Sequence, residues 1–243
     1  MKTTDWKDTS VGEIVAEDFA AAKVFKKYGI DFCCHGEVTL EKACASLKLA
    51  PEEVMQALKQ QKENGEGRIP FSSWPLDLLM DYILKIHHRG IRKKWSGNCW
   101  PCWKKVERVH GEAHPELHEL KLLVSESLND LEMHLQKEEN VLFPYLYDLY
   151  SAQEQGQRME PMHCGTIANP IRVMRMEHEG EGNRYLHIIQ LTDHFSVPQD
   201  GCASYRLLMQ ELEAFVDALF EHIHLENNLL FPRFEEIERQ IVG

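Results

Sequence analysis

The sequence predicts an all-α protein in which a small helical domain precedes an up-down four-helix bundle. The main observation is a repeated motif, H-x-x-x-E followed by Leu-Phe-Pro, at residues 134–144 and again at residues 222–232. In both copies the histidine and the glutamate share a helical stripe with apolar residues, so both pairs are expected to face a core. Two such pairs on facing helices supply much of a two-metal site inside a bundle.

Residues 1–66 are expected to form the small domain. Thr9 or Ser10 is a suitable N-cap for a first turn, Gly29 is a suitable helix end, and Pro51 suits the first turn of a further helix. The expected helices begin near residue 11 and then cover about residues 20–28, 39–47 and 52–61.

The second domain is expected at residues 74–243, after a polar linker with glycine and proline at residues 62–70. Residues 97–110, which include the motif Cys99-Trp100-Pro101-Cys102, are expected to be broken rather than helical. The two Leu-Phe-Pro endings lie 88 positions apart, so the second pair of helices repeats the first. The four long helices are expected at about residues 75–95, 115–144, 171–194 and 202–241, with the second ending at Pro144 or a turn later.

Composition excludes several classes of protein. The net charge of -12 argues against nucleic acid as a main partner, because phosphate binding needs a basic face. No apolar run approaches the roughly 20 residues of a membrane span, and the N-terminus has no apolar signal segment. The seven cysteines are an odd number and include the adjacent pair Cys33 and Cys34. We therefore expect a protein of the reducing cytoplasm without a disulfide framework.

The repeated motif supplies the first candidates for metal ligands. Glu138 and Glu226 suit a bridging position, because a carboxylate has two oxygens to share between two ions. His134 and His222 suit terminal positions on opposite ions. A carboxylate on an apolar stripe needs a metal, a cation or a proton, and the alternative of two solvated surface pairs is less favoured for two matched copies.

Other histidines extend this set. His178 lies on an apolar stripe of the third long helix and should face inward. On the first helix, periodicity leaves His87 and His88 as alternatives. His110 lies too far along the chain from His88 and His134 to share an ion on an uninterrupted helix, so it would have to fold back from the connection between the first two helices.

The motifs, taken in order, resemble those of the di-iron proteins that repair iron–sulfur clusters, which carry a Cys-Cys domain before a hemerythrin-like bundle. The resemblance covers nearly the whole chain. Five motifs carry it. They are D-F-C-C-H-G at residues 31–36, K-V-E-R-V-H at residues 105–110, H-x-x-x-E-E-x-V-L-F-P at residues 134–144, M-x-x-E-H at residues 174–178, and E-H-I-x-L-E-N-N-x-L-F-P at residues 221–232.

This resemblance implies a hemerythrin-like fold and a di-iron centre bridged by an oxo or hydroxo group. It also implies repair of clusters damaged by oxidative or nitrosative stress, through iron donation or through reduction of nitric oxide. The implied partners are damaged iron–sulfur proteins and, as small ligands, nitric oxide or oxygen, and a homodimer is compatible with the resemblance. The implied metal ligands are His88, His110, His134, Glu138, His178, His222 and Glu226.

The cysteines carry separate expectations. The resemblance implies that Cys33 and Cys34 act as exchange thiols in catalysis or iron delivery, and the alternative is a packed structural pair. His35 stands where the family often has glycine. Cys99 and Cys102 depart from the family pattern, and C-x-x-C suits a dithiol redox couple or half of a metal site.

Two other functions remain open at this point. A hemerythrin-like oxygen carrier or iron sensor would use the same ligands without catalysis, although a carrier needs no thiols. A purely structural bundle would bury the histidine–glutamate pairs without a metal. The donors also accept manganese or a mixed pair of metals.

Overall fold

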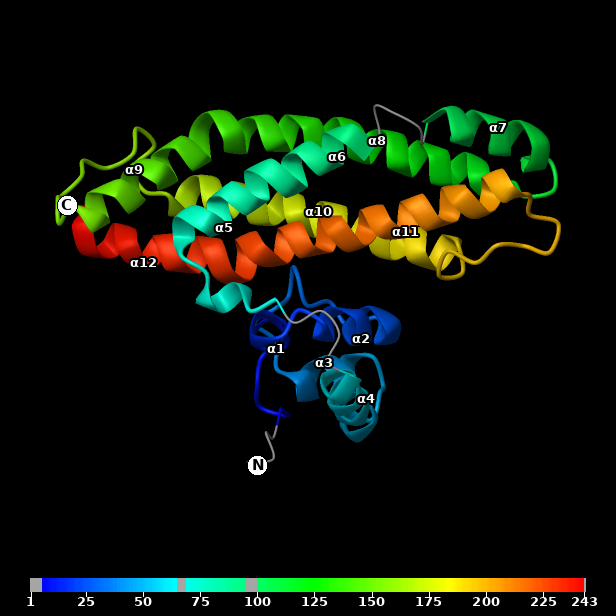
Figure 1. Cartoon of the computed structure of the whole chain (residues 1–243), viewed down its shortest axis with the longest axis horizontal. Helices are drawn as coiled ribbons and strands as arrows, with labels where there is room; N and C mark the ends of the chain where they lie inside the picture. The colour runs from blue at the N-terminus through cyan, green and yellow to red at the C-terminus, as the bar shows by residue number, and fades with distance from the viewer. Residues whose placement is uncertain (1–5, 65–68, 95–99, 243) are drawn as a thin grey trace. The chain divides into compact units, whose positions relative to one another are not determined.

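The computed structural model describes residues 6–64, 69–94 and 100–242, and the regular elements in these ranges are helices (Figure 1). The expected all-α class is therefore confirmed. The only strand-like pairings in the described ranges are isolated bridges, such as the one between Ser10 and Thr39. The chain divides into two compact units. Unit 1 comprises Met1–Met80, Leu149–Thr166 and Ile223–Gly243, and unit 2 comprises Asp81–Asp148 and Ile167–His222.

The first helices of unit 1 begin and end where local chemistry predicts. They are α1 (Val11–Glu17), α2 (Ala21–Tyr28), α3 (Leu40–Ser46) and α4 (Pro51–Asn64). Ser10 forms a capping box with Glu13, and Thr39 caps α3. Gly29 ends α2 in the left-handed conformation, at φ 69°, which glycine adopts without steric cost.

Unit 1 also contains η1 (Phe71–Ser73), η5 (Leu225–Leu230) and α12 (Phe231–Ile241). Within this unit, Thr166 donates a short hydrogen bond to Glu238, and the backbone N–H of Met159 donates to the carbonyl of Ile241. These contacts fix the segment after residue 154 against α12.

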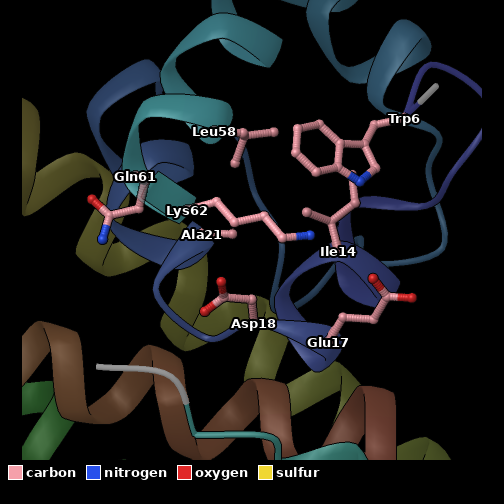
Figure 2. Close-up of a pocket in the computed structure, with 8 residues that line it drawn as sticks. All are labelled: Trp6, Ile14, Glu17, Asp18, Ala21, Leu58, Gln61 and Lys62. Atoms are coloured by element: carbon pink, nitrogen blue, oxygen red, sulfur yellow. The ribbon is translucent and has the colours of Figure 1, made fainter. Parts of the chain in front are cut away.

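A small pocket lies among the first helices of unit 1 (Figure 2). The side chain of Lys62 extends across it, and the Lys62 ammonium lies 5.7 Å from the centre of the Trp6 ring. Such a cation–π contact covers the indole face. The lining residues are Trp6, Ile14, Glu17, Asp18, Ala21, Leu58, Gln61 and Lys62.

Unit 2 is built from the long helices, and Figure 1 shows α8, α10 and α11 running alongside one another. The first, third and fourth long helices lie close to where the sequence predicts them. Three of the four, the first, second and fourth, continue through short π-helical segments, and the fourth runs from α11 into η5 and α12. The elements are α5 (Leu76–Tyr82), η2 (Ile83–His88), α6 (Arg89–Lys94), α8 (Glu116–Lys137), η4 (Glu138–Leu142), α9 (Phe143–Glu154), α10 (Ala168–Leu191) and α11 (Ala203–His224). The part of α5 up to Met80 and the part of α9 from Leu149 belong to unit 1.

Two expectations about helix boundaries are wrong. The stretch expected to be broken contains α7 (Trp100–His110), because Trp103 and Val106 are three residues apart and bury on one face of a helix. The second long helix ends neither at Pro144 nor a turn later but continues as α9 to Glu154. Cys99 lies outside the described residues, and so does the side chain of Cys102.

The π-helical segments η4 and η5 have a common cause in the sequence. Each precedes a Phe-Pro pair, at Pro144 and Pro232, and proline has no N–H to donate to the carbonyl four residues earlier. In both places the phenylalanine N–H instead donates to a carbonyl five residues earlier, that of Glu138 or Glu226. A π turn of this kind is rare and is often found at functional sites.

The core of unit 2 is largely apolar, and one hydrogen-bonded group of polar side chains is buried within it. Ser127 donates to Glu181 at 2.6 Å and lies 2.8 Å from the hydroxyl of Tyr185, and all three side chains are buried. These bonds satisfy polar atoms that would be costly to bury alone. No helix in the described ranges is long and apolar enough to cross a membrane.

Candidate metal centre

Five buried side chains bring metal-ligand atoms to one place. One donor atom from each lies within 4.8 Å of the donor atoms of the others. Four come from separate elements of unit 2, and the fifth, Glu226, follows His222 by one turn on the same continuous helix. The five are His134, Glu138, His178, His222 and Glu226.

Glu138 is the clearest sign that this cluster fits a cation. Its side chain is 0% exposed, and neither carboxylate oxygen has a hydrogen-bond partner among the described residues. Its two oxygens lie 3.3 Å from Nε2 of His134 and 3.4 Å from Nε2 of His88. Burying an ionised carboxylate without hydrogen bonds costs several kcal/mol or more, so the group needs a positive charge at this place. The residues present therefore fit a bound metal.

The imidazole rings of the cluster point nitrogen atoms toward one another. Nε2 of His178 lies 3.1 Å from Nε2 of His134, and both residues are buried. The centre of the His222 ring lies 5.3 Å from that of His88 and 5.8 Å from that of His178. Nitrogens that face one another in this way can surround a shared metal, and neutral imidazole is the form that binds metal.

Two carboxylates outside the cluster orient the histidines. Glu177 lies 2.8 Å from Nδ1 of His134, and Glu139 lies 2.9 Å from Nδ1 of His88. When Nδ1 donates to a carboxylate, Nε2 is left to face the metal, which is a common arrangement around metal-binding histidines. Lys137 pairs with Glu177 and Arg92 pairs with Glu139, so both carboxylates are themselves held in place.

The electrostatics of the protein alone show how strongly these groups interact. Burial lowers the pKa of His134, but Glu138 and Glu177 outweigh burial and raise this pKa to about 9. Burial raises the pKa of Glu138, but the nearby histidines, His134 first, outweigh burial and lower it. Burial holds the pKa of His222 well below its ordinary value, so its ring is neutral. In the protein alone, the Glu138 carboxylate is thus paired with a protonated His134 beside a neutral His222, and a bound metal would take the place of the His134 proton.

The structure separates the two candidates on the first long helix. Nε2 of His88 faces Glu138 at 3.4 Å, whereas Nε2 of His87 lies 3.5 Å from Glu221, outside the cluster. The His87 ring also packs edge-on against Tyr82, with the ring centres 5.1 Å apart. Of the two, His88 has the geometry of a ligand.

The structure does not bring His110 to the cluster. α7 and α8 form a tight hairpin in which Glu107 pairs with Lys121. His110 lies at the turn, and its ring packs against Tyr205, with the ring centres 5.5 Å apart. From the start of α8 at Glu116 to His134 the helix rises roughly 27 Å. Because the connection turns back at once, it cannot carry His110 to the ion.

The predicted thiols lie in unit 1, in a second group of ligand-type side chains formed by Asp31, Cys33 and Cys34. Cys33 is buried and Cys34 is partly exposed. Contact with Cys34 and burial raise the pKa of Cys33 well above its usual value. The structure therefore brings these two residues together with a carboxylate that the sequence analysis had not assigned to them.

Sequence reasoning also missed Glu139 and Glu177. Both stand next to predicted ligands, as Glu138-Glu139 and Glu177-His178, and this adjacency was an available signal. Adjacent residues point to different sides of a helix, so Glu139 and Glu177 cannot join their neighbours as ligands but reach histidines of other helices.

Comparison with known proteins places this arrangement in a class. Residues 79–234 match the hemerythrin HHE cation binding domain, and residues 7–62 match the ScdA_N domain of unknown function, DUF542. The chain is thus a hemerythrin-type cation-binding protein with an N-terminal ScdA_N domain.

Two curated relatives identify the family. The iron-sulfur cluster repair protein YtfE of Yersinia pseudotuberculosis serotype IB (strain PB1/+) is 33% identical over 232 residues, which cover 94% of this chain and 97% of the relative. The protein of the same name from Yersinia pestis (strain Pestoides F) has the same identity and coverage. The chain belongs to the family of iron–sulfur cluster repair proteins.

Proposed function

We propose that this protein restores iron–sulfur clusters damaged by oxidative or nitrosative stress, by means of two iron ions held in its bundle. The observation that carries the proposal is the buried Glu138 carboxylate, which faces imidazole nitrogens and has no hydrogen-bond partner among the described residues. The names of the relatives support the repair role, and the cation-binding family supports iron as the metal.

The proposed ligands are four imidazoles and two carboxylates. When bound, the two irons, joined by an oxo or hydroxo group, would supply electrons and an exchangeable metal. Imidazole ligands are neutral, so the set carries only two negative charges against two divalent ions. A site with so little negative charge holds ferrous iron without trapping it, which suits donation. The ligands are His88, His134, Glu138, His178, His222 and Glu226.

The chain's other groups have supporting parts in this proposal. Glu139 and Glu177 orient His88 and His134. Cys33 and Cys34, in a small domain at residues 1–66, serve as exchange thiols, while residues 74–243 hold the irons. The partners are damaged iron–sulfur proteins of the cytoplasm.

The test is reactivation of a damaged cluster enzyme. Aconitase is inactivated with nitric oxide and then incubated with the purified, iron-loaded chain. We expect recovery of activity with the wild type and with Glu119→Ala, whose side chain is exposed on α8. The variant Glu138→Ala, Glu226→Ala should give no recovery beyond buffer. Equal recovery with this variant would refute the proposal.

Labelled iron separates the two routes to repair. If iron donation restores the cluster, ⁵⁷Fe loaded on this chain should appear in the reactivated aconitase. If nitric oxide reduction does so, nitrous oxide should form in the headspace in proportion to added reductant, and the recovered cluster should contain unlabelled iron. Reversible oxygen binding over many cycles without either product would instead favour a carrier.

A further inference from the structure

The loop formed by residues 30–36 gathers three ligand-type side chains, and the role of exchange thiols proposed for Cys33 and Cys34 does not account for the carboxylate beside them. One donor atom each of Asp31, Cys33 and Cys34 lies within 4.8 Å of the others. We propose that this loop is a separate binding site for one divalent, thiophilic cation, with the two thiolates and the Asp31 carboxylate as ligands.

Two of the three distances between donor atoms match those of a tetrahedral metal site, and the third is at most 4.8 Å. The two sulfur atoms lie 3.8 Å apart, and Oδ1 of Asp31 lies 3.3 Å from the sulfur of Cys33. Metal–sulfur bonds of about 2.3 Å at a tetrahedral angle place two sulfurs about 3.8 Å apart, and a metal–oxygen bond of about 2.0 Å places oxygen and sulfur about 3.5 Å apart. A metal would need only small movements of these side chains.

The Asp31 carboxylate is fixed in place before any ion binds. Oδ1 accepts hydrogen bonds from the backbone N–H groups of Cys33 and Cys34, at 3.1 and 2.9 Å. Oδ2 lies 2.7 Å from Nδ1 of His35. One oxygen therefore faces the sulfurs while the other is held by an imidazole. A hydrogen bond from an outer group to a ligating carboxylate is common at metal sites, and here the histidine at position 35 provides it.

Side chains of η5 hold the loop from outside within the same unit. The amide of Asn228 donates to the carbonyls of Phe32 and Cys33, at 3.1 and 3.2 Å, and Asn227 also donates to the carbonyl of Cys33. Asn228 approaches Gly36 so closely that a Cβ at that glycine would lie 2.2 Å from the amide oxygen. The loop is therefore preorganised, which lowers the entropy cost of binding.

The donor set selects the class of ion. Two thiolates and a carboxylate carry three negative charges and include soft sulfur, which favours Fe²⁺, Zn²⁺ or Co²⁺ over Mg²⁺ or Ca²⁺. Binding forms two metal–sulfur bonds and releases one proton from each thiol. Cys33 is buried and Cys34 is partly exposed, so the ion would have one open side through which to exchange.

The role of this loop site in iron transfer rests on the proposed function, but the binding of a cation by the loop does not. In a protein that donates iron, a site with an open side can hold a ferrous ion in transit to a damaged cluster. The ion would bind here even if the bundle held no iron at all.

Cobalt is a suitable probe, because Co²⁺ bound by thiolates absorbs through a sulfur-to-cobalt charge-transfer band. The titration uses the full chain with Glu138→Gln and Glu226→Gln, so that the bundle ligands are weakened. We expect the band to saturate at one Co²⁺ per chain. Asp31→Asn should weaken binding at least about tenfold, and Cys33→Ser with Cys34→Ser should abolish the band.

Two controls keep this test decisive. Cys164→Ser, at an exposed cysteine of unit 1, should leave the titration unchanged. In the iron-loaded wild type, Zn²⁺ should protect Cys33 and Cys34, but not Cys164, from alkylation. A band that persists without Cys33 and Cys34, or that disappears instead when Cys99 and Cys102 are replaced by serine, would overturn the proposal. Failure of the iron-loaded wild type to restore aconitase, with the cobalt band of the loop intact, would count against the repair function alone.

Discussion

Glu138 illustrates how single residues define the site. It begins the π-helical segment η4, is fully buried, and lies within 3.4 Å of nitrogens from two different helices. His134 and Glu138 were predictable as a pair from the spacing H-x-x-x-E. The contact with His88 was not, because periodicity allowed His87 equally and only the resemblance preferred His88.

The outer carboxylates give the first prediction at this scale. Glu177→Gln removes the negative charge that holds Nδ1 of His134, so the ring is less firmly oriented toward the metal. We expect iron affinity to fall about 10–100-fold. A competition titration against a chromophoric ferrous chelator measures this change. Glu126→Gln, on the exposed face of α8, should bind iron as the wild type does. Unchanged affinity in Glu177→Gln would show that His134 needs no outer partner.

The π-helical segments matter at the scale of elements. Sequence periodicity predicted the long helices but not the π turns, because an i, i+4 pattern assumes an uninterrupted α-helix. The signal for two of them was present in the Phe-Pro pairs. No proline directly follows η2, which carries His87 and His88, so its π turn does not arise from a Phe-Pro pair.

Removing the proline tests this explanation. In Pro144→Ala the restored N–H can donate to the carbonyl of Asn140, and the chain can return to a regular α-helix. The direction of the Glu138 carboxylate would then change. We expect unchanged helix content by circular dichroism but lower iron content per chain. Iron content equal to that of the wild type would show that the proline does not set the π turn.

The α7–α8 turn gives a pH prediction. His114 lies 3.0 Å from Asp200, and this carboxylate, aided by Glu116, raises the pKa of His114, while His114 lowers the pKa of Asp200. A histidine with a raised pKa stabilises the fold below its ordinary pKa of 6.5, and the effect is lost as pH rises through the raised value. An aspartate with a lowered pKa stabilises the fold above its ordinary pKa of 3.8, and this effect is lost as pH falls through the lowered value.

The pair of His114 and Asp200 should therefore stabilise the fold between pH 3.8 and 6.5 and make no contribution in alkaline buffer. Asp200→Asn should lower the melting temperature by at most a few degrees between pH 3.8 and 6.5, because the pair is partly exposed. In alkaline buffer the two proteins should melt together. A difference that is the same at every pH would point to packing rather than to charge.

At the scale of the whole molecule, the fold class and the order of the elements followed from the sequence because apolar periodicity and capping residues are local. His110 shows where that reasoning fails. Its distance from the cluster depends on how α7 turns into α8, and a one-dimensional pattern carries no information on the direction of a turn. The Asp31–Cys33–Cys34 group was missed for a related reason, since it depends on loop conformation.

Metal removal provides a prediction for the molecule as a whole. A ligand that binds only the folded state adds about 2.7 kcal/mol of stability at 100 times its dissociation constant. Chelation of iron should therefore lower the melting temperature by about 5–10 °C, and reloading should restore it. The Glu138→Gln, Glu226→Gln variant that also carries Cys33→Ser and Cys34→Ser, and so lacks both proposed sites, should show no such shift. A wild type that melts identically with and without chelator would mean that the buried carboxylates do not hold the metal.

The most direct measurement is the metal content, with a Mössbauer spectrum, of chain purified without oxygen. The variant Cys33→Ser, Cys34→Ser isolates the bundle from the proposed loop site. The account predicts two iron ions per chain with the spectrum of a coupled pair, and loss of that pair when Glu138 and Glu226 are also replaced by glutamine. Iron that is absent from the first variant, or that persists unchanged in the second, would contradict it.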